Sequence, residues 1–227
     1  MMGEGVPAER RWCGAPTWPP PPERTTALFL QPAGGLGAAP PASGAEASSY
    51  VYDPADPVPT LWTPEFRTMV SDRNRLSHRE DILRFRTEPL PSATTVVGCP
   101  LVRLHCKSAT PDTDFFARLV DEHPAAGDGS AGRALEVSYA MLRASSVPGF
   151  EADTPTELVI ELGPTACSFA AGHRIRLEVT SSCWPNHDRN HNTGRNDLFD
   201  ADLVVTTNSV LHSAGHASCL ELPTIDF

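Results

Sequence analysis

The residues best suited to chemistry lie in one polar run, His-Asp-Arg-Asn-His-Asn-Thr-Gly, at positions 187–194. His187 and His191 are four residues apart, which on a helix would present two imidazoles on one face, as in zinc proteases. The run is rich in turn residues and has no helical period, so we expect the two rings to diverge and predict no metal site here. Its other side chains can hydrogen-bond backbone groups instead. We therefore expect an ordered structural loop formed by Asp188, Arg189, Asn190, Asn192, Thr193 and Gly194.

Two pairs of charged residues allow more than one interpretation. Asp112 and Asp114 could bind calcium or act as general acid and base, because paired carboxylates serve in both. An Asp-Thr-Asp run at the start of a strand is more typical of a turn anchored by hydrogen bonds to the backbone. Asp188 and Arg189 could clamp a ligand, but we favour an internal Arg–Asp network that braces the loop. The sequence thus predicts structural roles for these residues, without a metal or a cofactor.

Serine-based hydrolysis would need a nucleophile elbow, G-x-S-x-G, in which a strained turn presents the hydroxyl beside an oxyanion hole. The chain contains no such motif. The nearest match, Gly-Ser-Ala-Gly at 129–132, has the wrong spacing and falls in a Gly-rich stretch typical of a hairpin turn. We predict no catalytic residue in this chain.

Short strands must position the polar loop. Residues 174–180 alternate Ile175, Leu177 and Val179 with polar neighbours, the period of a strand with one buried face. No segment has a sustained helical period. Strand character also recurs at residues 26–30, 82–85, 94–106, 115–121, 135–142, 157–162, 202–206 and 218–222. Short strands separated by Pro and Gly turns predict an all-β, jelly-roll β-sandwich of the galactose-binding-like type, behind an irregular Pro/Gly-rich N-terminal segment.

Composition limits the classes of function. The formal net charge of −10 over 227 residues argues against nucleic acid and against an anionic membrane surface as partners. No apolar run reaches the length of a membrane helix, and the first eleven residues lack the apolar centre of a signal peptide. This favours the cytoplasm without deciding the compartment. Six cysteines without a C-x-x-C pair predict mostly buried, reduced thiols.

Four motifs resemble the cocaine esterase and X-Pro dipeptidyl-peptidase family of serine hydrolases. Residues 171–194 are similar to the family's "PGHRIR-E-SSS-FP--DRN-NTG", and residues 52–60 to its "YDPADPVPT". Residues 79–90 are similar to "R-DVL-F-T-PL", and residues 112–121 to "DTDF-A-LVDV". The motifs stand in the family's order.

The resemblance implies that this chain is the C-terminal jelly-roll domain of such an enzyme, detached or truncated. We expect residues 1–25 to be a remnant of the α/β-hydrolase domain and its linker, and residues 26–227 to form the jelly roll. In the resembled enzymes the catalytic triad lies in the α/β-hydrolase domain, so the expected partner is that domain, in cis or in trans. The expected role is to pack on it and complete the substrate cleft, in an enzyme that acts as a dipeptidyl-peptidase or an acyl-esterase.

The aromatic residues leave two further hypotheses. The resemblance implies that the loop after residue 60 lies towards the cleft, so Leu61 and Trp62 are possible cleft-facing residues. Separation from the catalytic domain would expose apolar surface around Trp12, Trp18 and Leu28, and we expect self-association of the isolated chain. The alternative function is a free-standing module that binds carbohydrate or peptide, which would need an exposed aromatic platform.

Overall fold

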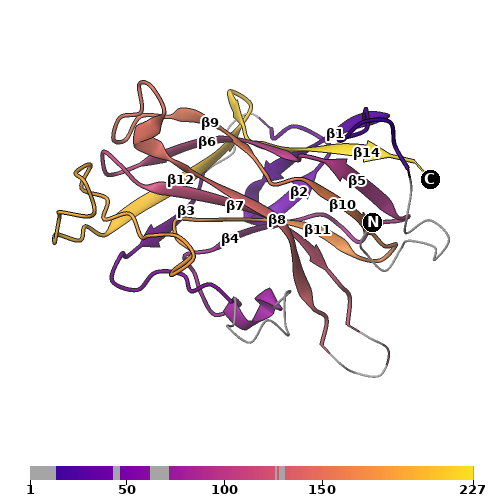
Figure 1. Cartoon of the computed structure of the whole chain (residues 1–227), viewed down its shortest axis with the longest axis horizontal. Coiled ribbons are helices and arrows are strands. Elements are labelled where there is room, and N and C mark those ends of the chain that lie inside the picture. The colour runs from indigo at the N-terminus through magenta and orange to yellow at the C-terminus, as the bar shows by residue number, and fades with distance from the viewer. Residues whose placement is uncertain (1–13, 43–46, 62–71, 126, 128–130, 227) are drawn as a thin grey trace.

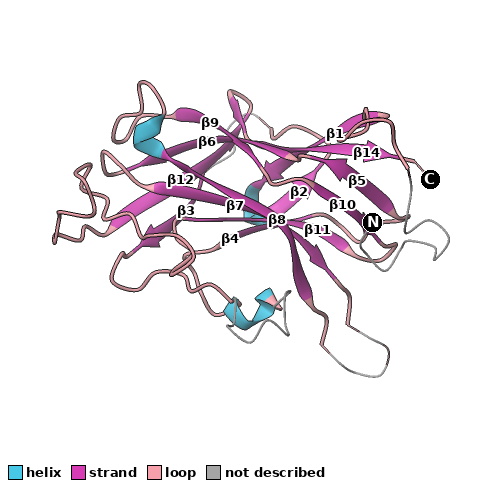
Figure 2. Cartoon of the chain, in the orientation of Figure 1, coloured by secondary structure: helices cyan, strands magenta, loops and turns pink. Residues whose placement is uncertain are grey.

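The described part of the chain covers residues 14–42, 47–61, 72–125, 127 and 131–226, and it is almost entirely β-structure. In this computed structural model the strands form one elongated body (Figures 1 and 2). The strands are β1 (Arg24–Gln31), β2 (Gly35–Gly37), β3 (Ala47–Tyr52), β4 (Leu83–Arg86), β5 (Thr94–Gly98), β6 (Leu101–Ser108), β7 (Asp114–Glu122), β8 (Ala134–Arg143), β9 (Thr156–Glu161), β10 (Thr165–Phe169), β11 (Arg174–Thr180), β12 (Thr206–Ser213), β13 (His216–Ala217) and β14 (Cys219–Ile225).

The helical content within these ranges is three short 3-10 turns, η2 (Pro32–Gly34), η3 (Arg73–Leu76) and η4 (Ala144–Ser146). No helix of the described residues is long and apolar enough to cross a membrane. The all-β sandwich predicted from the sequence is confirmed.

The strands pair in one hydrogen-bonded path, β13-β12-β6-β14-β1-β2-β4-β11-β7-β8. Off this path, β3 pairs with β12 and β9 pairs with β6. Strand β5 pairs with both β14 and β10. Nearly all neighbours are antiparallel. The exception is the single pair Gly35↔Arg86, which links β2 to β4 and so connects the layer of β4, β11, β7 and β8 to the remaining strands.

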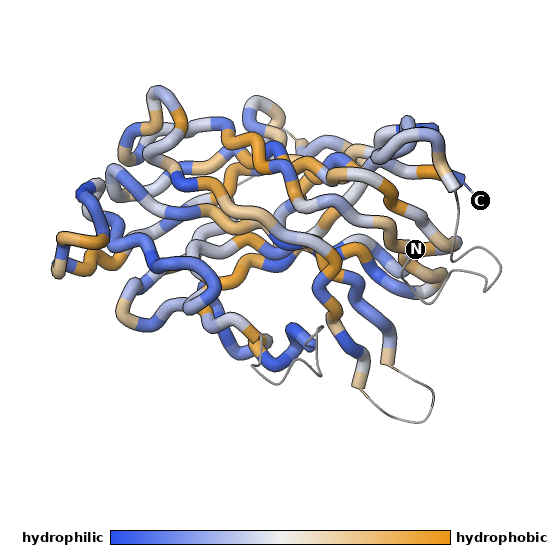
Figure 3. The backbone as a smooth tube through the Cα atoms, viewed as in Figure 1, coloured by the Kyte–Doolittle hydropathy of each residue, from blue (hydrophilic) through white to orange (hydrophobic). Residues whose placement is uncertain are grey.

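One apolar core lies between the layers. Leu119 of β7 and Leu177 of β11 are fully buried in the same cluster as Leu104 of β6 and Leu220 of β14. Alternation places these side chains on one face of each strand. Figure 3 shows the resulting pattern, with hydrophobic segments along the strands and hydrophilic loops at the ends.

The other face of β7 and β11 is covered by a buried layer of charges. Glu178 of β11 accepts a hydrogen bond from Arg73 Nε at 2.5 Å and another from Arg176 Nη2. Arg118 of β7 pairs with Glu136 of β8. Arg73 belongs to η3, so this short turn lies over the charged face of the sheet. Coverage on both sides explains why β7 is buried at every residue except its last.

Two strand predictions were wrong in extent. The predicted strand at 94–106 is two strands, β5 and β6, because Pro100 lacks a backbone donor and Gly98 adopts a φ of +126°. The predicted strand at 202–206 is mostly an exposed loop, and β12 begins only at Thr206. The apolar run 203–205 resembles a strand in composition, but it lies on the surface and faces no core.

The cysteines are free thiols at every described position. Cys106, Cys167, Cys183 and Cys219 are buried and Cys99 is half-buried, while Cys13 lies outside the described residues. Burial raises the pKa of Cys167 to about 12. A thiol with so high a pKa is almost never the reactive thiolate at neutral pH.

Candidate functional site

The candidate site is the loop between β11 and β12, at the left end of the sandwich in Figure 1. The loop carries the polar run 187–194 and packs against the start of β7 and the end of β8. We call residues 181–205 the β11–β12 loop. Its conformation depends on side chains that lie far away in the sequence.

Asn190 joins the loop to β3 and to the start of β7 by hydrogen bonds. It is fully buried, and its Nδ2 donates to Asp112 Oδ2 and to Asp114 Oδ1, both at 3.0 Å. Its Oδ1 accepts from the backbone N–H of Asn192 at 2.8 Å. Its backbone carbonyl accepts from the Tyr52 hydroxyl at 3.0 Å. One side chain thus joins the loop to the entry of β7, and an apolar substitute would leave several buried groups unpaired.

Arg143, at the end of β8, balances the charge of the two aspartates. Its Nε lies 2.9 Å from Asp114 Oδ1, and its Nη1 lies 3.0 Å from Asp197 Oδ2. Burial raises the pKa of Asp114, and the hydrogen bonds from Arg143 and Asn190 oppose that rise. Asp112 has a separate partner, since its Oδ1 accepts from the Ser145 backbone N–H at 2.9 Å. The geometry is that of a fixed network whose carboxylates already have donors.

The second half of the loop is fixed by local contacts. Asn192 adopts a φ of +64°, and its Nδ2 donates to the Val204 carbonyl at 2.6 Å. Gly194 has a φ of +72°, and a Cβ there would lie 3.2 Å from Pro111 Cγ. The Thr193 hydroxyl donates to Asp200 at 2.5 Å. These contacts account for the Asn-Thr-Gly sequence at a left-handed turn that presses on a proline.

We expected Asp188 and Arg189 to take part in an internal Arg–Asp network, but no hydrogen bond or ion pair joins these two side chains in the described structure. Asp188 is exposed and has no side-chain hydrogen bond in the described structure, whereas Arg189 donates to the Pro54 carbonyl at 2.9 Å. The Arg189 guanidinium carbon also lies 5.8 Å from the centroid of the Trp184 ring. The carboxylates that brace the loop are instead Asp112, Asp114 and, outside the prediction, Asp197.

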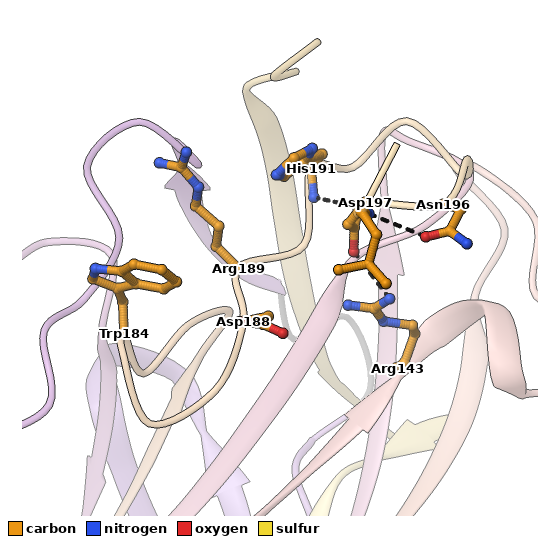
Figure 4. A pocket seen from close by; sticks show the side chains of 8 residues that line it. Arg143, Trp184, Asp188, Arg189, His191, Asn196 and Asp197 are labelled. Atoms are coloured by element: carbon orange, nitrogen blue, oxygen red, sulfur yellow. Dashed lines mark hydrogen bonds and ion pairs between the residues drawn. The ribbon is translucent and has the colours of Figure 1, made fainter. Parts of the chain in front are cut away.

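A pocket of about 590 Å³ opens beside this network (Figure 4). Its lining residues are Arg143, Trp184, Asp188, Arg189, His191, Asn196, Asp197 and Leu198. The mixture of charged side chains and apolar surface could hold a polypeptide segment or a small polar ligand. These lining residues include no serine, threonine or cysteine.

Large apolar side chains are exposed around the same loop. Leu198 and Phe199 are 80% and 87% exposed, and Trp184, Val204 and Val205 are each more than a third exposed. We call these five residues the loop-end patch. Figure 3 shows a hydrophobic segment at the tip of this otherwise hydrophilic loop. The expected patch around Trp12, Trp18 and Leu28 is wrong in one respect, because Leu28 is buried. Trp18 is 60% exposed, and Trp12 lies outside the described residues.

The remaining predicted positions fall away from this network. Trp62 lies outside the described residues. Leu61 is half-buried and packs against the small cluster of Val58, Leu76 and Ile82. His187 lies 3.2 Å from the Tyr139 hydroxyl, while the His191 backbone bonds Asp197, so the two histidines have separate environments.

Sequence reasoning missed three members of the network, namely Arg143, Asp197 and Tyr52. Arg143 reaches the loop only because β7 pairs with β8 in the register Asp114↔Arg143. A strand-pairing prediction could have found it, since cross-strand neighbours of opposite charge stabilise a sheet.

The chain matches known proteins over most of its length. The family described as X-Pro dipeptidyl-peptidase C-terminal non-catalytic domain matches residues 1–221. The cocaine esterase of Rhodococcus sp. (strain MB1 Bresler) is 32% identical, over 97% of this chain and 42% of the relative.

Solved structures agree with these matches. An aminopeptidase from a marine sediment Thaumarchaeota archaeon superposes with a TM-score of 0.84 at 28% identity, covering 92% of this chain and 38% of that one. An α-amino acid ester hydrolase gives a TM-score of 0.80 at 30% identity, covering 88% and 36%. The chain thus spans about two fifths of the length of the proteins that it matches, and the resemblance seen in its motifs is confirmed.

Proposed function

Because this chain belongs to the family of X-Pro dipeptidyl-peptidase C-terminal non-catalytic domains, we propose that its sandwich packs on an α/β-hydrolase domain of the same polypeptide and completes the substrate cleft. The sandwich corresponds to residues 26–227 in this proposal, together with Arg24 and Thr25, which begin β1, and the residues before β1 belong to the connection with the catalytic domain. The whole enzyme would be a serine hydrolase that acts as a dipeptidyl-peptidase or an acyl-esterase.

The loop-end patch is the observation that carries this proposal. Surfaces between domains are partly apolar, and a soluble monomer rarely exposes several large apolar side chains together. Here Leu198 and Phe199 project from a loop that Asn190, Arg143 and Asp114 hold in place. A rigid loop can present an apolar contact at little cost in conformational entropy.

In this arrangement the chemistry belongs to the partner domain. A serine would attack an ester or a peptide bond after proline, a histidine would carry the proton, and backbone amides would hold the oxyanion. This chain would supply a wall of the cleft. The pocket beside Trp184 and Arg189 is a hollow of the described surface that could form part of that wall.

A chimera tests the proposal. This chain would replace the matching region of the Rhodococcus cocaine esterase, and ester hydrolysis and thermal inactivation would be measured. We expect Leu198→Ser with Phe199→Ser to shorten the half-life of activity at elevated temperature, because the domains lose apolar contact. Val159→Ser is the matched control, since Val159 is also exposed, at 47%, but lies on β9. Equal half-lives for the double variant and the parent chimera would overturn the proposed contact.

The alternative is a free-standing module that binds carbohydrate or peptide. Trp184 supports it, because the ring is 42% exposed, lines the pocket and lies beside Arg189. Titration of the chain with oligosaccharides and Pro-containing peptides separates the two hypotheses. Saturable binding that Trp184→Ala removes would favour the module, and unchanged fluorescence of the chain would favour the packing role.

A further inference from the structure

A second group of polar side chains lies at the opposite end of β7 from Asp114. Asp121 is buried between two histidines: its Oδ1 lies 2.8 Å from His173 Nδ1, and its Oδ2 lies 3.3 Å from His123 Nε2. One potential ligand atom from each of the three residues lies within 4.8 Å of the other two. The β11–β12 loop and the loop-end patch play no part in this cluster.

Strand geometry accounts for the convergence. Asp121 and His123 are two apart at the end of β7, so their side chains project from the same face. The pairs Asp121↔Ile175 and Glu122↔Arg174 bring β11 alongside, and one step further places His173 opposite His123. Directly opposed residues of an antiparallel pair have Cβ atoms about 5 Å apart. The signal in the sequence is therefore an Asp-x-His strand end facing a His that precedes the paired strand.

The environment favours a cation in the middle of the group. The Asp121 and His173 side chains are 6% exposed and that of His123 is 9% exposed. The two imidazole rings lie 4.2 Å apart between centroids with a tilt of 37°, and one nitrogen of each ring lies within 3.3 Å of an Asp121 oxygen. Imidazole nitrogens and a carboxylate oxygen that converge in this way can share one ion.

We propose that Asp121, His123 and His173 form a binding site for a divalent transition-metal ion, with zinc as the best fit. Zinc binds imidazole nitrogen at about 2.0–2.1 Å and carboxylate oxygen at about 2.0–2.2 Å, so tetrahedral ligand atoms lie about 3.4 Å apart. The spacings of 2.8 Å from Asp121 Oδ1 to His173 Nδ1 and of 3.3 Å from Asp121 Oδ2 to His123 Nε2 are close to that value, and all three potential ligand atoms lie within 4.8 Å of one another. Calcium and magnesium fit poorly, because they require oxygen ligands.

The ion would link the paired strands β7 and β11 at one end of the sandwich. Asp121 lies near the end of β7, His123 directly follows that strand and His173 directly precedes β11, so the ion would bridge the β7–β11 pair. Binding to the folded chain alone would raise its stability by mass action. This role is independent of the proposed packing on a hydrolase domain.

Calorimetry of the metal-free chain tests the site. The purified 227-residue protein would be stripped with EDTA, dialysed, and titrated with zinc chloride. We expect one zinc per chain and a rise in melting temperature. His123→Gln should weaken zinc binding by more than about 100-fold, the upper end of the effect of losing an outer hydrogen-bond partner of a metal ligand. Cobalt should give the absorption bands of a tetrahedral site in the parent protein and lose them in the variant.

His216→Gln is the matched control, because it removes an imidazole from another histidine pair, His105 and His216, whose centroids lie 5.6 Å apart. Asp121→Asn keeps the side-chain shape and serves as the second variant if His123→Gln does not fold by circular dichroism. Zinc binding that is absent in the parent protein would overturn the site. So would binding that survives in His123→Gln and Asp121→Asn, or that falls equally in His216→Gln.

Discussion

At the scale of single residues, the β11–β12 loop holds two polar side chains two positions apart with opposite environments. Asn190 is fully buried and joined to Asp112 and Asp114, whereas Asp188 is exposed. We expect Asn190→Ala to lower the free energy of unfolding by roughly 1–3 kcal/mol, because two buried carboxylates and a backbone N–H lose a partner. Urea denaturation at neutral pH measures the change.

Asp188→Ala is the internal control for that experiment. An exposed side chain without a hydrogen bond contributes little, so we expect a change within about 0.5 kcal/mol. Equal effects of the two substitutions would contradict the proposal that the hydrogen bonds of Asn190 stabilise the loop. Thermal melts of the parent protein with and without calcium test whether Asp112 and Asp114 form a calcium site. An unchanged melting temperature excludes that role.

The residues of this network show how far composition and spacing can predict a site. Asn190, Asp112 and Asp114 could be named in advance, because turn-forming residues beside strand ends suggest hydrogen bonding to neighbours. Arg143 and Tyr52 could not, since they reach Asp114 and Asn190 through strand pairing across 29 and 138 positions of the chain. The same limitation hid the cluster of Asp121, His123 and His173.

At the scale of elements, the charged face of β11 supports a prediction about pH. Burial on its own would raise the pKa of Glu178, but Arg73 and Arg176 outweigh burial and the pKa is lowered. A carboxyl whose pKa is lower in the folded chain adds stability above its unfolded pKa, about 4.3, and loses that stability as the pH falls. Glu178→Gln should therefore cost roughly 3–5 kcal/mol at pH 7, because it leaves buried guanidinium groups without their counter-ion.

Chemical denaturation of both proteins at neutral and acid pH checks this prediction. The difference between parent and variant should shrink as the pH falls below about 4.3. Glu157→Gln is the control: Glu157 pairs with Arg103 at 3.5 Å with both side chains 44% exposed, so its loss should cost less than about 1 kcal/mol. A difference that stays constant with pH would show that the charge of Glu178 is not what stabilises β11.

Strand prediction worked where apolar and polar residues alternate, even though both faces of the strand are buried. Residues 174–180 alternate and form β11 with those bounds. β3 was missed, although Tyr50 and Tyr52 alternate with exposed neighbours, because it follows a stretch rich in Pro, Gly and Ala. The opposite error occurred at residues 203–205, where we predicted a strand and the structure has a loop. This apolar triplet has the composition of a strand but does not pair with one. Propensity alone cannot distinguish burial in a core from contact with a second domain.

At the scale of the whole molecule, the chain should be catalytically inert by itself. It has no G-x-S-x-G motif, and the family that it belongs to is described as non-catalytic. We expect no turnover of a p-nitrophenyl ester or of an X-Pro chromogenic substrate by the purified chain. Hydrolysis that a serine-directed phosphonate abolishes would contradict this expectation, and a parallel assay of a family esterase confirms that the substrates are sound.

The isolated chain should also self-associate, through the loop-end patch and not through Leu28, which is buried. Leu198 and Phe199 are at least 80% exposed, and apolar area removed from water contributes about 25 cal/mol per Å². Two chains can bury these side chains against each other when no hydrolase domain covers them.

Light scattering over a range of concentrations should show a mass that rises with concentration in the parent protein. Leu198→Ser with Phe199→Ser should reduce that rise and Val159→Ser should not, because Val159 lies on β9, outside the loop-end patch. A parent chain that stays monomeric throughout would mean that the patch is too small to hold two copies together, and that its partner must offer a complementary surface that this chain lacks.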